Sequence, residues 1–540
     1  MSVSIVKTTP FDDQKPGTSG LRKQVKVFSK PSYLANFVQS IFDAVPSLAG
    51  QTLVLGGDGR YFSREAIEII LRIAAGNNVR RVILGVNGLV ATPAASHLIR
   101  TNRAGGGILL TASHNPGGPD GDFGVKFNSA DGGSAPGEVM SAIFKRTKTL
   151  DQIKLAKAEL PEGFLDQVGS RQFGVMEIET VDSVSTYADL QESLFDFPAI
   201  RKWLKTHSMM FDAMHGATGP YAMEIFEKRL GVDSANLLRC DPREDFGGLS
   251  PDPNLVHAKE LYDTMMGPNA PDFAAASDGD GDRNLIIGRH CYVSPSDSLA
   301  VLAANAKHVP AFENGLKGAA RSMPTSSALD CVAKAQSLPC FETPTGWKYF
   351  SELLEADRIS ICGEESAGTG ADHIREKDGP WAVLFWLNVL AKREIGVVDI
   401  MKDHFATYGR TFHRRHDFEG LDSQKAASLM ADLEGKLSDL IGADGVVSAD
   451  NFAYESPVTG SMTQGQGIRI IREDGSRMVF RLSGTGTSGA TLRVYLEQYT
   501  QNADLFDADP DEALSELSKL ANRLAEISVR TGRTQPDVIT

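Results

Sequence analysis

Three times along this chain, a short apolar segment typical of a buried strand ends in a polar or glycine-rich loop, and helical segments lie between the strands. The first strand ends at Ser113, the second in the run 278–282, and the third in the run 363–366. Strands that alternate with helices predict parallel or mixed sheets covered on both faces. Because ligands of open α/β sheets bind at the carboxyl ends of strands, these loops are the candidate functional loops.

The last quarter of the chain follows another pattern. A predicted helix at 422–437 precedes strands at 478–482 and 491–496, and the stretch 510–531 is mostly helical. A chain of 540 residues is too long for one hydrophobic core. We therefore expect three similar α/β mixed-sheet domains and a C-terminal α+β domain, with boundaries at 1–182, 183–300, 301–396 and 397–540.

Local signals place several elements. Residues 52–55 are typical of a strand that runs into Gly56-Gly57-Asp58, and 63–75 of a helix with Ser63 as its N-cap. The pattern of 218–230 predicts a helix in the second domain.

Composition excludes several classes of protein. The formal net charge of −14 argues against a nucleic-acid binder, although a local positive cluster can still bind a small anion. The five cysteines are odd in number and form no C-x-x-C pair, which favours free thiols in a reducing compartment. The N-terminus lacks an apolar signal segment, and the most apolar window, 381–391, is too short to span a bilayer. We expect a soluble cytoplasmic protein that binds neither nucleic acid nor membrane.

The loop 278–282 carries Asp278, Asp280 and Asp282 on alternate positions, with glycines between them. Hard carboxylate oxygens suit Mg²⁺ or Ca²⁺. A calcium-binding EF-hand is excluded because Arg283 replaces the required glycine and Arg289 the bidentate glutamate. The alternative to a metal site is a solvated acidic turn.

The loop Thr111-Ala-Ser113-His114-Asn-Pro places a serine after a strand, where it could act as a nucleophile. It lacks the G-x-S-x-G pattern of hydrolases. Taken alone, this motif is more often an ordinary loop.

The run 484–489 matches G-x-G-x-x-G, but the segment after it alternates like a strand, which excludes a dinucleotide fingerprint. Ala490 at the lysine position excludes a Walker A loop. A glycine- and hydroxyl-rich loop between Arg481 and Arg493 favours a phosphate cradle over a flexible hairpin turn. The run Gly363-Glu-Glu-Ser-Ala-Gly368 suits recognition of sugar hydroxyls, although adjacent glutamates usually lie on solvated faces.

Together these four loops resemble one family. The chain is similar to the α-D-phosphohexomutase superfamily, and most closely to the phosphoglucomutases, from the run 15–22 to beyond Arg493. Thr-Ala-Ser-His-Asn-Pro resembles the phosphoserine loop, Asp-Gly-Asp-Gly-Asp-Arg the metal loop, Gly-Glu-Glu-Ser the sugar loop and Ser-Gly-Thr-Gly-Thr-Ser the phosphate loop. The run 372–379 resembles the glucose-specific branch. Ala367 departs from the bulky aromatic residue of animal members, which affects the expected shape of the sugar loop.

The resemblance implies four domains around a central cleft and reversible interconversion of glucose 1-phosphate and glucose 6-phosphate. Phosphate on Ser113 would pass to the sugar, and glucose 1,6-bisphosphate would serve as intermediate and activator. One Mg²⁺ per chain would be held by Asp278, Asp280, Asp282 and the phosphoryl group on Ser113. Lys126 resembles the proton-transfer residue of the family, with His114 as the other candidate, and Arg22 and Lys377 complete the catalytic set. The substrate-binding residues implied are Thr18, Ser19, Arg283, Thr345, Gly346, Glu364, Ser366, His373, Arg481, Ser483, Gly484, Thr485, Thr487 and Arg493.

Two alternatives stay open. One is a mutase that acts mainly on mannose or glucosamine phosphates, and the other is a non-catalytic scaffold or signalling phosphoprotein of the same family. The retained Ser113 and three aspartates argue against the second. The expected partners are small sugar phosphates, and the protein itself is expected to be a monomer or a weak dimer.

Overall fold

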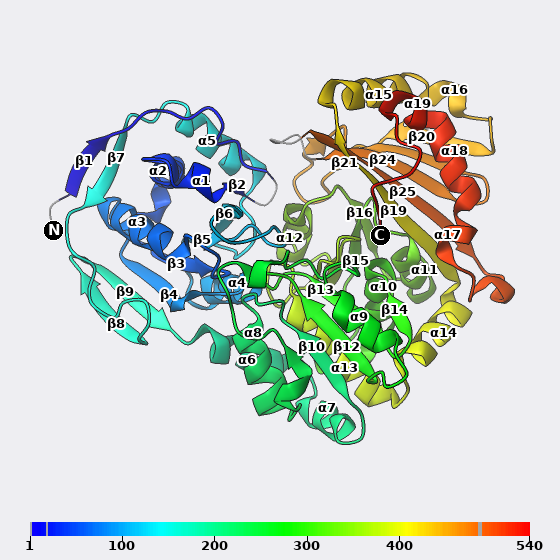
Figure 1. Cartoon of the computed structure of the whole chain (residues 1–540), viewed down its shortest axis with the longest axis horizontal. Coiled ribbons are helices and arrows are strands. Elements are labelled where there is room, and N and C mark those ends of the chain that lie inside the picture. The colour runs from blue at the N-terminus through cyan, green and yellow to red at the C-terminus, as the bar shows by residue number, and fades with distance from the viewer. Residues whose placement is uncertain (1–2, 18–19, 484–488) are drawn as a thin grey trace. The chain divides into compact units, whose positions relative to one another are not determined.

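The computed structural model describes residues 3–17, 20–483 and 489–540 (Figure 1). It divides into two compact units: Met1–Ala319 with Gly346–Val398, and Ala320–Thr345 with Asp399–Thr540. The division falls inside the third predicted domain, because the segment 320–345 belongs to the same unit as the C-terminal part of the chain.

The first unit opens with a seven-stranded mixed sheet in the order β2-β6-β5-β3-β4-β9-β8. Its four central strands are parallel and its outer pairs are antiparallel. The strands are β2 (Leu21–Gln24), β3 (Thr52–Gly57), β4 (Arg81–Leu89), β5 (Gly106–Leu110), β6 (Asp122–Ser129), β8 (Gly169–Phe173) and β9 (Met176–Val181). A separate two-stranded ribbon pairs β1 (Val3–Lys7) with β7 (Gln152–Ala156).

Helices cover both faces of this sheet. Leu53 and Leu55 of β3 join one core with α2 (Tyr33–Ala44), α3 (Ser63–Gly76) and α5 (Gly137–Thr147). Val54, which points to the opposite face, lies outside that core, and α4 (Thr92–Thr101) packs against β3 and β5. The loops that follow β3 and β5 therefore emerge together at one edge of the sheet.

A second sheet in the same unit has the order β11-β10-β12-β13-β14. Its strands are β10 (Met209–Asp212), β11 (Leu237–Leu238), β12 (Phe273–Ser277), β13 (Asn284–Gly288) and β14 (Cys291–Val293). The associated helices are α6 (Ser183–Leu194), α7 (Phe197–Leu204), α8 (Gly219–Ala222) and α9 (Lys259–Met266). The predicted helix at 218–230 is confirmed, and it consists of α8 followed directly by a π-helix at Met223–Arg229.

The third region contributes an antiparallel pair, β17 (Ile361–Gly363) and β18 (Thr369–Ala371), to the first unit. Three helices, α10 (Pro295–Asn305), α12 (Trp347–Glu355) and α13 (Gly379–Arg393), accompany it. In α13, every residue from Trp381 to Leu390 is buried, which explains why all of them except Asn388 are apolar. None of the helices in the described part of the chain combines the length and apolar character that a bilayer-spanning segment needs.

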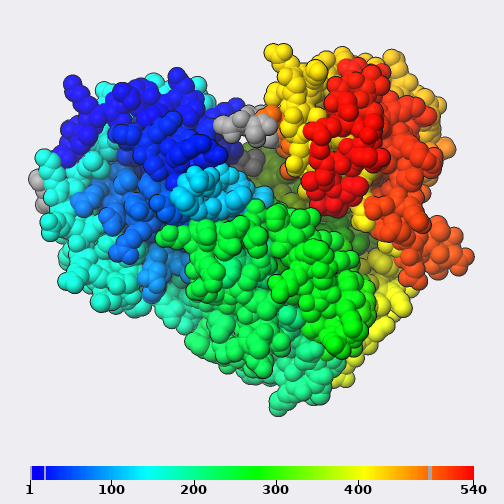
Figure 2. All heavy atoms as spheres, viewed as in Figure 1, coloured from blue at the N-terminus to red at the C-terminus, as the bar shows by residue number. Residues whose placement is uncertain are grey.

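The second unit is built on an antiparallel sheet in the order β20-β23-β24-β25-β19-β26. Its strands are β19 (Arg410–Leu421), β20 (Val446–Asn451), β23 (Ile468–Arg472), β24 (Arg477–Ser483), β25 (Ala490–Thr500) and β26 (Val538–Ile539). The helices α15 (Ser423–Gly435), α18 (Ser515–Ala525) and α19 (Ile527–Thr531) share one core with the sheet. Figure 2 shows α18 and α19 in red at the surface beside α15 in yellow.

Buried charges tie the segment 320–345 to this sheet. This segment holds α11 (Ala328–Gln336), β16 (Cys340–Thr343) and most of β15 (Ala319–Ser322). Arg477 of β24 donates to Glu497 of β25 through Nε at 3.1 Å and to Glu342 of β16 through Nη1 at 3.0 Å. Arg321 of β15 also pairs with Glu342, at 2.9 Å, so charges of the segment and of the sheet form one network. The segment and the C-terminal sheet therefore form one unit.

Candidate active site

Ser113 lies at the centre of the candidate site, three residues beyond the end of β5. Its side chain is 1% exposed and its backbone is left-handed, with φ of +55°. The hydroxyl Oγ donates to Asp278 Oδ2 at 2.7 Å, and Nδ1 of His114 lies 3.4 Å from the same oxygen. The predicted nucleophile and the first predicted metal ligand, which are 165 residues apart in sequence, are thus in direct contact.

The three aspartates of the predicted metal loop follow β12 and are all buried. One oxygen from each carboxylate lies within 4.8 Å of the others. Oδ1 of Asp280 and Oδ1 of Asp282 are buried and have no hydrogen-bond partner among the residues that the structure describes. Buried carboxylate oxygens without donors are costly unless a cation neutralises them, and a hard cation prefers such ligands. The residues present therefore fit a divalent cation.

The protonation of this cluster supports the same conclusion. Burial, followed by the charges of Asp280 and Asp282, raises the pKa of Asp278 well above its ordinary value. Burial also opposes ionisation of Asp280, but Lys377 and Lys126 outweigh it, so the pKa of Asp280 is lowered. Three adjacent carboxylates repel one another until a positive charge is placed among them.

Basic residues surround the metal loop. Lys377 Nζ lies 3.1 Å from Asp282 Oδ2, and the Arg283 guanidinium lies about 4 Å from Asp278 and Asp282. Arg22 on β2 has a buried Nε that makes no hydrogen bond within the described part of the chain, and burial lowers the pKa of its guanidinium. These cations can bind phosphate oxygens close to the loop that carries Ser113.

Lys126, on β6, is held by a carboxylate that the sequence did not suggest. Its Nζ lies 2.5 Å from Oε1 of Glu376, which is fully buried. The same oxygen accepts hydrogen bonds from Asn128 Nδ2 at 2.9 Å and Ser134 Oγ at 3.1 Å. The proton-transfer candidate therefore has a fixed position and a fixed counter-charge.

The predicted sugar loop follows β17 and is attached to the metal loop. The backbone nitrogen of Asn284 donates to the carbonyl of Ala367 at 3.0 Å, and Ala367 has a left-handed backbone with φ of +72°. Glu364 Oε1 accepts a hydrogen bond from the Gly346 nitrogen at 3.2 Å. Burial raises the pKa of Glu364, and the positive charge of Lys377 opposes that rise. Ser366 is half-buried in the same turn.

His373 is engaged elsewhere within the first unit. Its Nε2 lies 2.9 Å from Asp378 Oδ2, and its ring stacks on Trp381 with centroids 5.3 Å apart. Asp378 caps α13 by accepting from the Trp381 nitrogen at 3.0 Å. Substrate binding by His373 stays a prediction.

In the second unit, Arg481 and Arg493 face each other across β24 and β25, and Asp417 of β19 is the register partner of Arg493. Two guanidinium groups in register repel unless an anion lies between them, and Arg493 Nε has a single carboxylate, Asp417, at 3.6 Å. Ser483 ends β24, and Thr345 carries a buried hydroxyl without a hydrogen-bond partner. The predicted residues Thr18, Ser19, Gly484, Thr485 and Thr487 lie outside the described residues.

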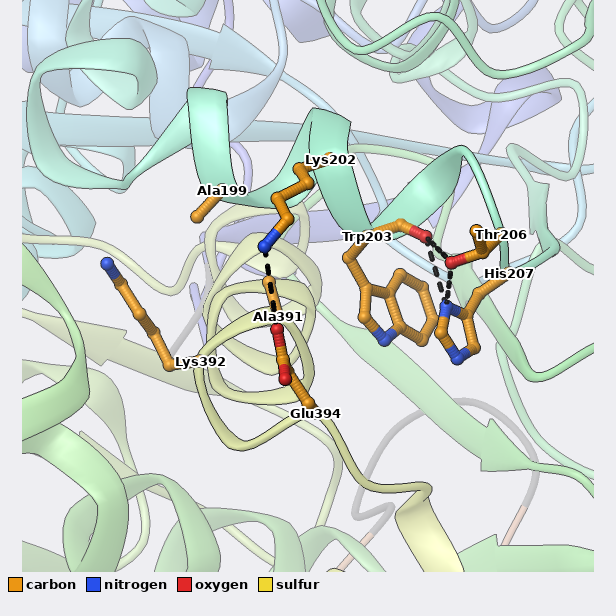
Figure 3. A pocket seen from close by; sticks show the side chains of 8 residues that line it. All are labelled: Ala199, Lys202, Trp203, Thr206, His207, Ala391, Lys392 and Glu394. Carbon is orange, nitrogen blue, oxygen red and sulfur yellow. Dashed lines mark hydrogen bonds and ion pairs between the residues drawn. The ribbon is translucent and has the colours of Figure 1, made fainter.

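Figure 3 shows a separate surface pocket of about 440 Å³ between α7 and the end of α13. Trp203 and His207 stack there with centroids 4.4 Å apart, and Lys202 pairs with Glu394 at 3.7 Å. None of the predicted site residues lines it. The pocket is therefore distinct from the candidate active site.

Comparison with known families covers the chain in four parts. Models of the phosphoglucomutase/phosphomannomutase α/β/α domains I, II and III match residues 13–154, 185–290 and 295–408. A model of the phosphoglucomutase-1 C-terminal domain matches residues 410–537. The predicted fold class, three α/β domains and a distinct C-terminal domain, is thereby confirmed.

Relatives match the entire chain. A phosphoglucomutase from Rhizobium radiobacter is 51% identical over all of both chains. A cytoplasmic phosphoglucomutase from Populus tremula is 49% identical over 100% of this chain and 99% of its own. Among solved structures, the open form of parafusin from Paramecium, an exocytosis-sensitive phosphoprotein and phosphoglucomutase, superposes with a TM-score of 0.93. It is 44% identical and covers 100% of this chain and 99% of its own. The predicted resemblance is confirmed: this chain belongs to the phosphoglucomutase/phosphomannomutase family.

Proposed function

We propose that this protein is a Mg²⁺-dependent phosphoglucomutase that interconverts glucose 1-phosphate and glucose 6-phosphate through a phosphoserine at Ser113. The observation that carries the proposal is the 2.7 Å contact between Ser113 Oγ and Asp278, inside a buried three-aspartate cluster. A phosphoryl group on this oxygen would lie among buried carboxylates, and such a concentration of negative charge is costly unless a cation neutralises it.

Asp278, Asp280 and Asp282 would hold Mg²⁺ together with one phosphoryl oxygen of Ser113. When bound, the ion would supply neutralisation of the charge on the transferring phosphoryl group. Lys377 and Arg283, which lie beside these carboxylates, would bind the remaining phosphoryl oxygens. Arg22, with an unused buried donor, would bind a phosphoryl oxygen in the same way.

The phosphoryl group would pass from Ser113 Oγ to a free sugar hydroxyl. Lys126 or His114 would give a proton to Ser113 Oγ as the phosphoryl group leaves, and would accept the proton of the sugar hydroxyl in exchange. Lys126 is fixed by Glu376 at 2.5 Å, and His114 lies 3.4 Å from Ser113 Oγ. The resulting glucose 1,6-bisphosphate would turn around and return its other phosphate to Ser113. Lys126→Met and His114→Gln separate the two candidates, since loss of the proton acceptor should lower kcat by roughly 100-fold or more.

Binding of the sugar would fall to Glu364 and Ser366, which share a turn attached to the metal loop. Arg481 and Arg493 would bind the non-reacting phosphate, because two guanidinium groups in register favour an anion. Thr18, Ser19, Thr345, Gly346, His373, Ser483, Gly484, Thr485 and Thr487 complete the proposed substrate contacts. We also place the protein in the cytoplasm, as a monomer or weak dimer. The cytoplasmic location is supported by the Populus tremula relative, which is a cytoplasmic phosphoglucomutase.

The test measures conversion of glucose 1-phosphate before and after chelation by EDTA, and after Mg²⁺ is restored. Intact-mass analysis of the wild-type protein should show one phosphate that glucose 6-phosphate removes, and Ser113→Ala should remove both phosphate and activity. Equal turnover of mannose and glucosamine phosphates would refute the choice of glucose. Absence of any turnover, with phosphate still on Ser113, would support the scaffold alternative.

A further inference from the structure

Both backbone groups of Ser113 are held by one buried ion pair that the mechanism does not otherwise use. The Ser113 nitrogen donates to Thr111 Oγ1 at 2.7 Å, and Thr111 Oγ1 lies 2.7 Å from Asp58 Oδ2 and 3.1 Å from Asp280 Oδ2. On the other side, Arg60 Nη2 donates to the Ser113 carbonyl at 2.9 Å. Asp58 and Arg60 bind each other through Arg60 Nε, which lies 3.0 and 2.9 Å from the two carboxylate oxygens.

The surroundings of Arg60 leave it little freedom. Its Nη1 donates to the Asp122 carbonyl at 2.8 Å, where β6 begins, and its guanidinium lies 5.1 Å from the centroid of the Phe246 ring. Asp122 in turn accepts from Asn115 Nδ2 at 2.9 Å, in the same loop as Ser113. Arg60 is 1% exposed and Asp58 0%. The pair therefore contacts both the loop that carries Ser113 and the strand that follows it.

Such a restraint has a physical purpose at this position. A serine with φ of +55° has a backbone conformation that residues with a side chain adopt only when their surroundings enforce it. A buried ion pair is in general a poor source of stability compared with apolar packing. Its value here lies in the planar guanidinium, which offers several donors in fixed directions, as a lysine ammonium does not.

We propose that Asp58 and Arg60 are positioning residues for phosphoryl transfer, fixing the direction in which Ser113 Oγ points. This inference rests on the proposed role of Ser113 as phosphoryl carrier. Neither residue touches the substrate in this scheme. Arg60 restrains the carbonyl of Ser113 directly, and Asp58 restrains the nitrogen by orienting the hydroxyl of Thr111. A displacement of about 1 Å at a reacting atom costs on the order of 100-fold in rate.

The first arm of the test compares Arg60→Lys with wild type. The variant keeps the positive charge but loses the planar set of guanidinium donors. We therefore expect kcat to fall tenfold to a hundredfold in both directions, while KM for both glucose phosphates stays within about threefold of wild type. Rephosphorylation of Ser113 by glucose 1,6-bisphosphate, followed by quenched-flow intact mass, should slow by the same factor. Arg477→Lys, in the buried pair with Glu497, is the control for loss of a buried guanidinium and should leave the rephosphorylation rate unchanged.

The second arm applies even if Arg60→Lys fails to fold. Thr111→Val keeps the shape of the side chain but removes the oxygen that accepts from Ser113, whereas Thr111→Ser keeps that oxygen. The valine variant should show the slow rephosphorylation, and the serine variant should recover most of the lost rate. If wild type carries a removable phosphate on Ser113 but Arg60→Lys or Thr111→Val rephosphorylates within threefold of wild type, the positioning role is refuted. If wild type carries no such phosphate, the proposed function fails instead.

Discussion

The Lys126–Glu376 pair allows a stability effect to be worked out from the structure. Glu376 Oε1 lies 2.5 Å from Lys126 Nζ and also accepts from Asn128 and Ser134, and its side chain is fully buried. In Glu376→Gln the neutral amide oxygen can still accept a hydrogen bond, but the ammonium loses its counter-charge. Breaking one partner of a buried pair costs about 3–5 kcal/mol. Because the amide retains one contact, we expect the lower end, about 3 kcal/mol.

The measurement is urea unfolding followed by tryptophan fluorescence. All four tryptophans lie in the first unit, which also holds this pair. The matched control is Glu355→Gln, because Glu355 pairs with Arg375 at 2.7 Å but its side chain is 54% exposed. An exposed partner contributes about 0–1 kcal/mol. Adding Lys126→Met to Glu376→Gln should restore part of the lost stability. A loss below 1 kcal/mol for Glu376→Gln, or no recovery in the double variant, would refute the reasoning.

Three further outcomes follow from the described contacts. Thr92 Oγ1 donates to Asp280 Oδ2 at 2.8 Å, so Thr92→Val should weaken Mg²⁺ affinity by roughly 10–100-fold in calorimetric titration, and unchanged affinity would contradict a metal site at Asp280. Glu364→Gln should lower turnover of glucose 1-phosphate about tenfold or more while phosphate is retained on Ser113, because a charge-assisted hydrogen bond to a sugar hydroxyl is lost; equal losses with mannose 1-phosphate would show that this loop does not select the sugar. His404 is 5% exposed, and burial lowers its pKa from 6.5 to about 4. As pH falls, the imidazole is therefore protonated in the unfolded chain before it is protonated in the folded protein, and the free energy of unfolding should decrease between about pH 6.5 and 4, by up to roughly 3 kcal/mol. Calorimetric unfolding of His404→Leu should lack this part of the pH dependence, and equal pH dependence in wild type and variant would contradict the prediction.

The parts of the site that sequence could predict are those whose signal is local. Asp278, Asp280 and Asp282 directly follow an apolar strand. Carboxylates on alternate positions of a short loop indicate a cation site without any information from distant parts of the sequence. Ser113 also follows a strand, β5, but its loop alone is more typical of an ordinary turn, and the prediction of its role depended on the resemblance to the phosphoserine loop. Ser113 and Asp278 both lie just beyond the carboxyl ends of strands, β5 and β12, where ligands of α/β sheets bind. In the structure these two residues are in contact.

Local signals were wrong where a turn or neighbouring packing decided the outcome. Ser63 was expected to cap α3, but Phe62 occupies the N-cap with φ of +77°, and the Ser63 hydroxyl is buried without a hydrogen-bond partner. The Ser63 nitrogen instead closes a turn onto the Arg60 carbonyl at 3.1 Å. That turn belongs to the arrangement that buries Arg60, so the position of Arg60 takes precedence over the local preference for a serine cap.

The sequence alone could not indicate the roles of Arg60 and Glu376, for a physical reason that extends to other enzymes of this architecture. Their roles depend on partners 53 and 250 residues away in sequence, so no periodicity or spacing marks them. Yet Asp58 follows β3 as Ser113 follows β5, and these strands are parallel neighbours. Parallel strands bring the residues just beyond their carboxyl ends together, whether or not those residues touch a ligand. When a nucleophile follows one strand, a charged residue that directly follows the neighbouring parallel strand is therefore a candidate to orient that nucleophile. In a short run such as Asp58-Gly59-Arg60, the basic residue lies close enough to the acidic one to serve as its buried counter-charge.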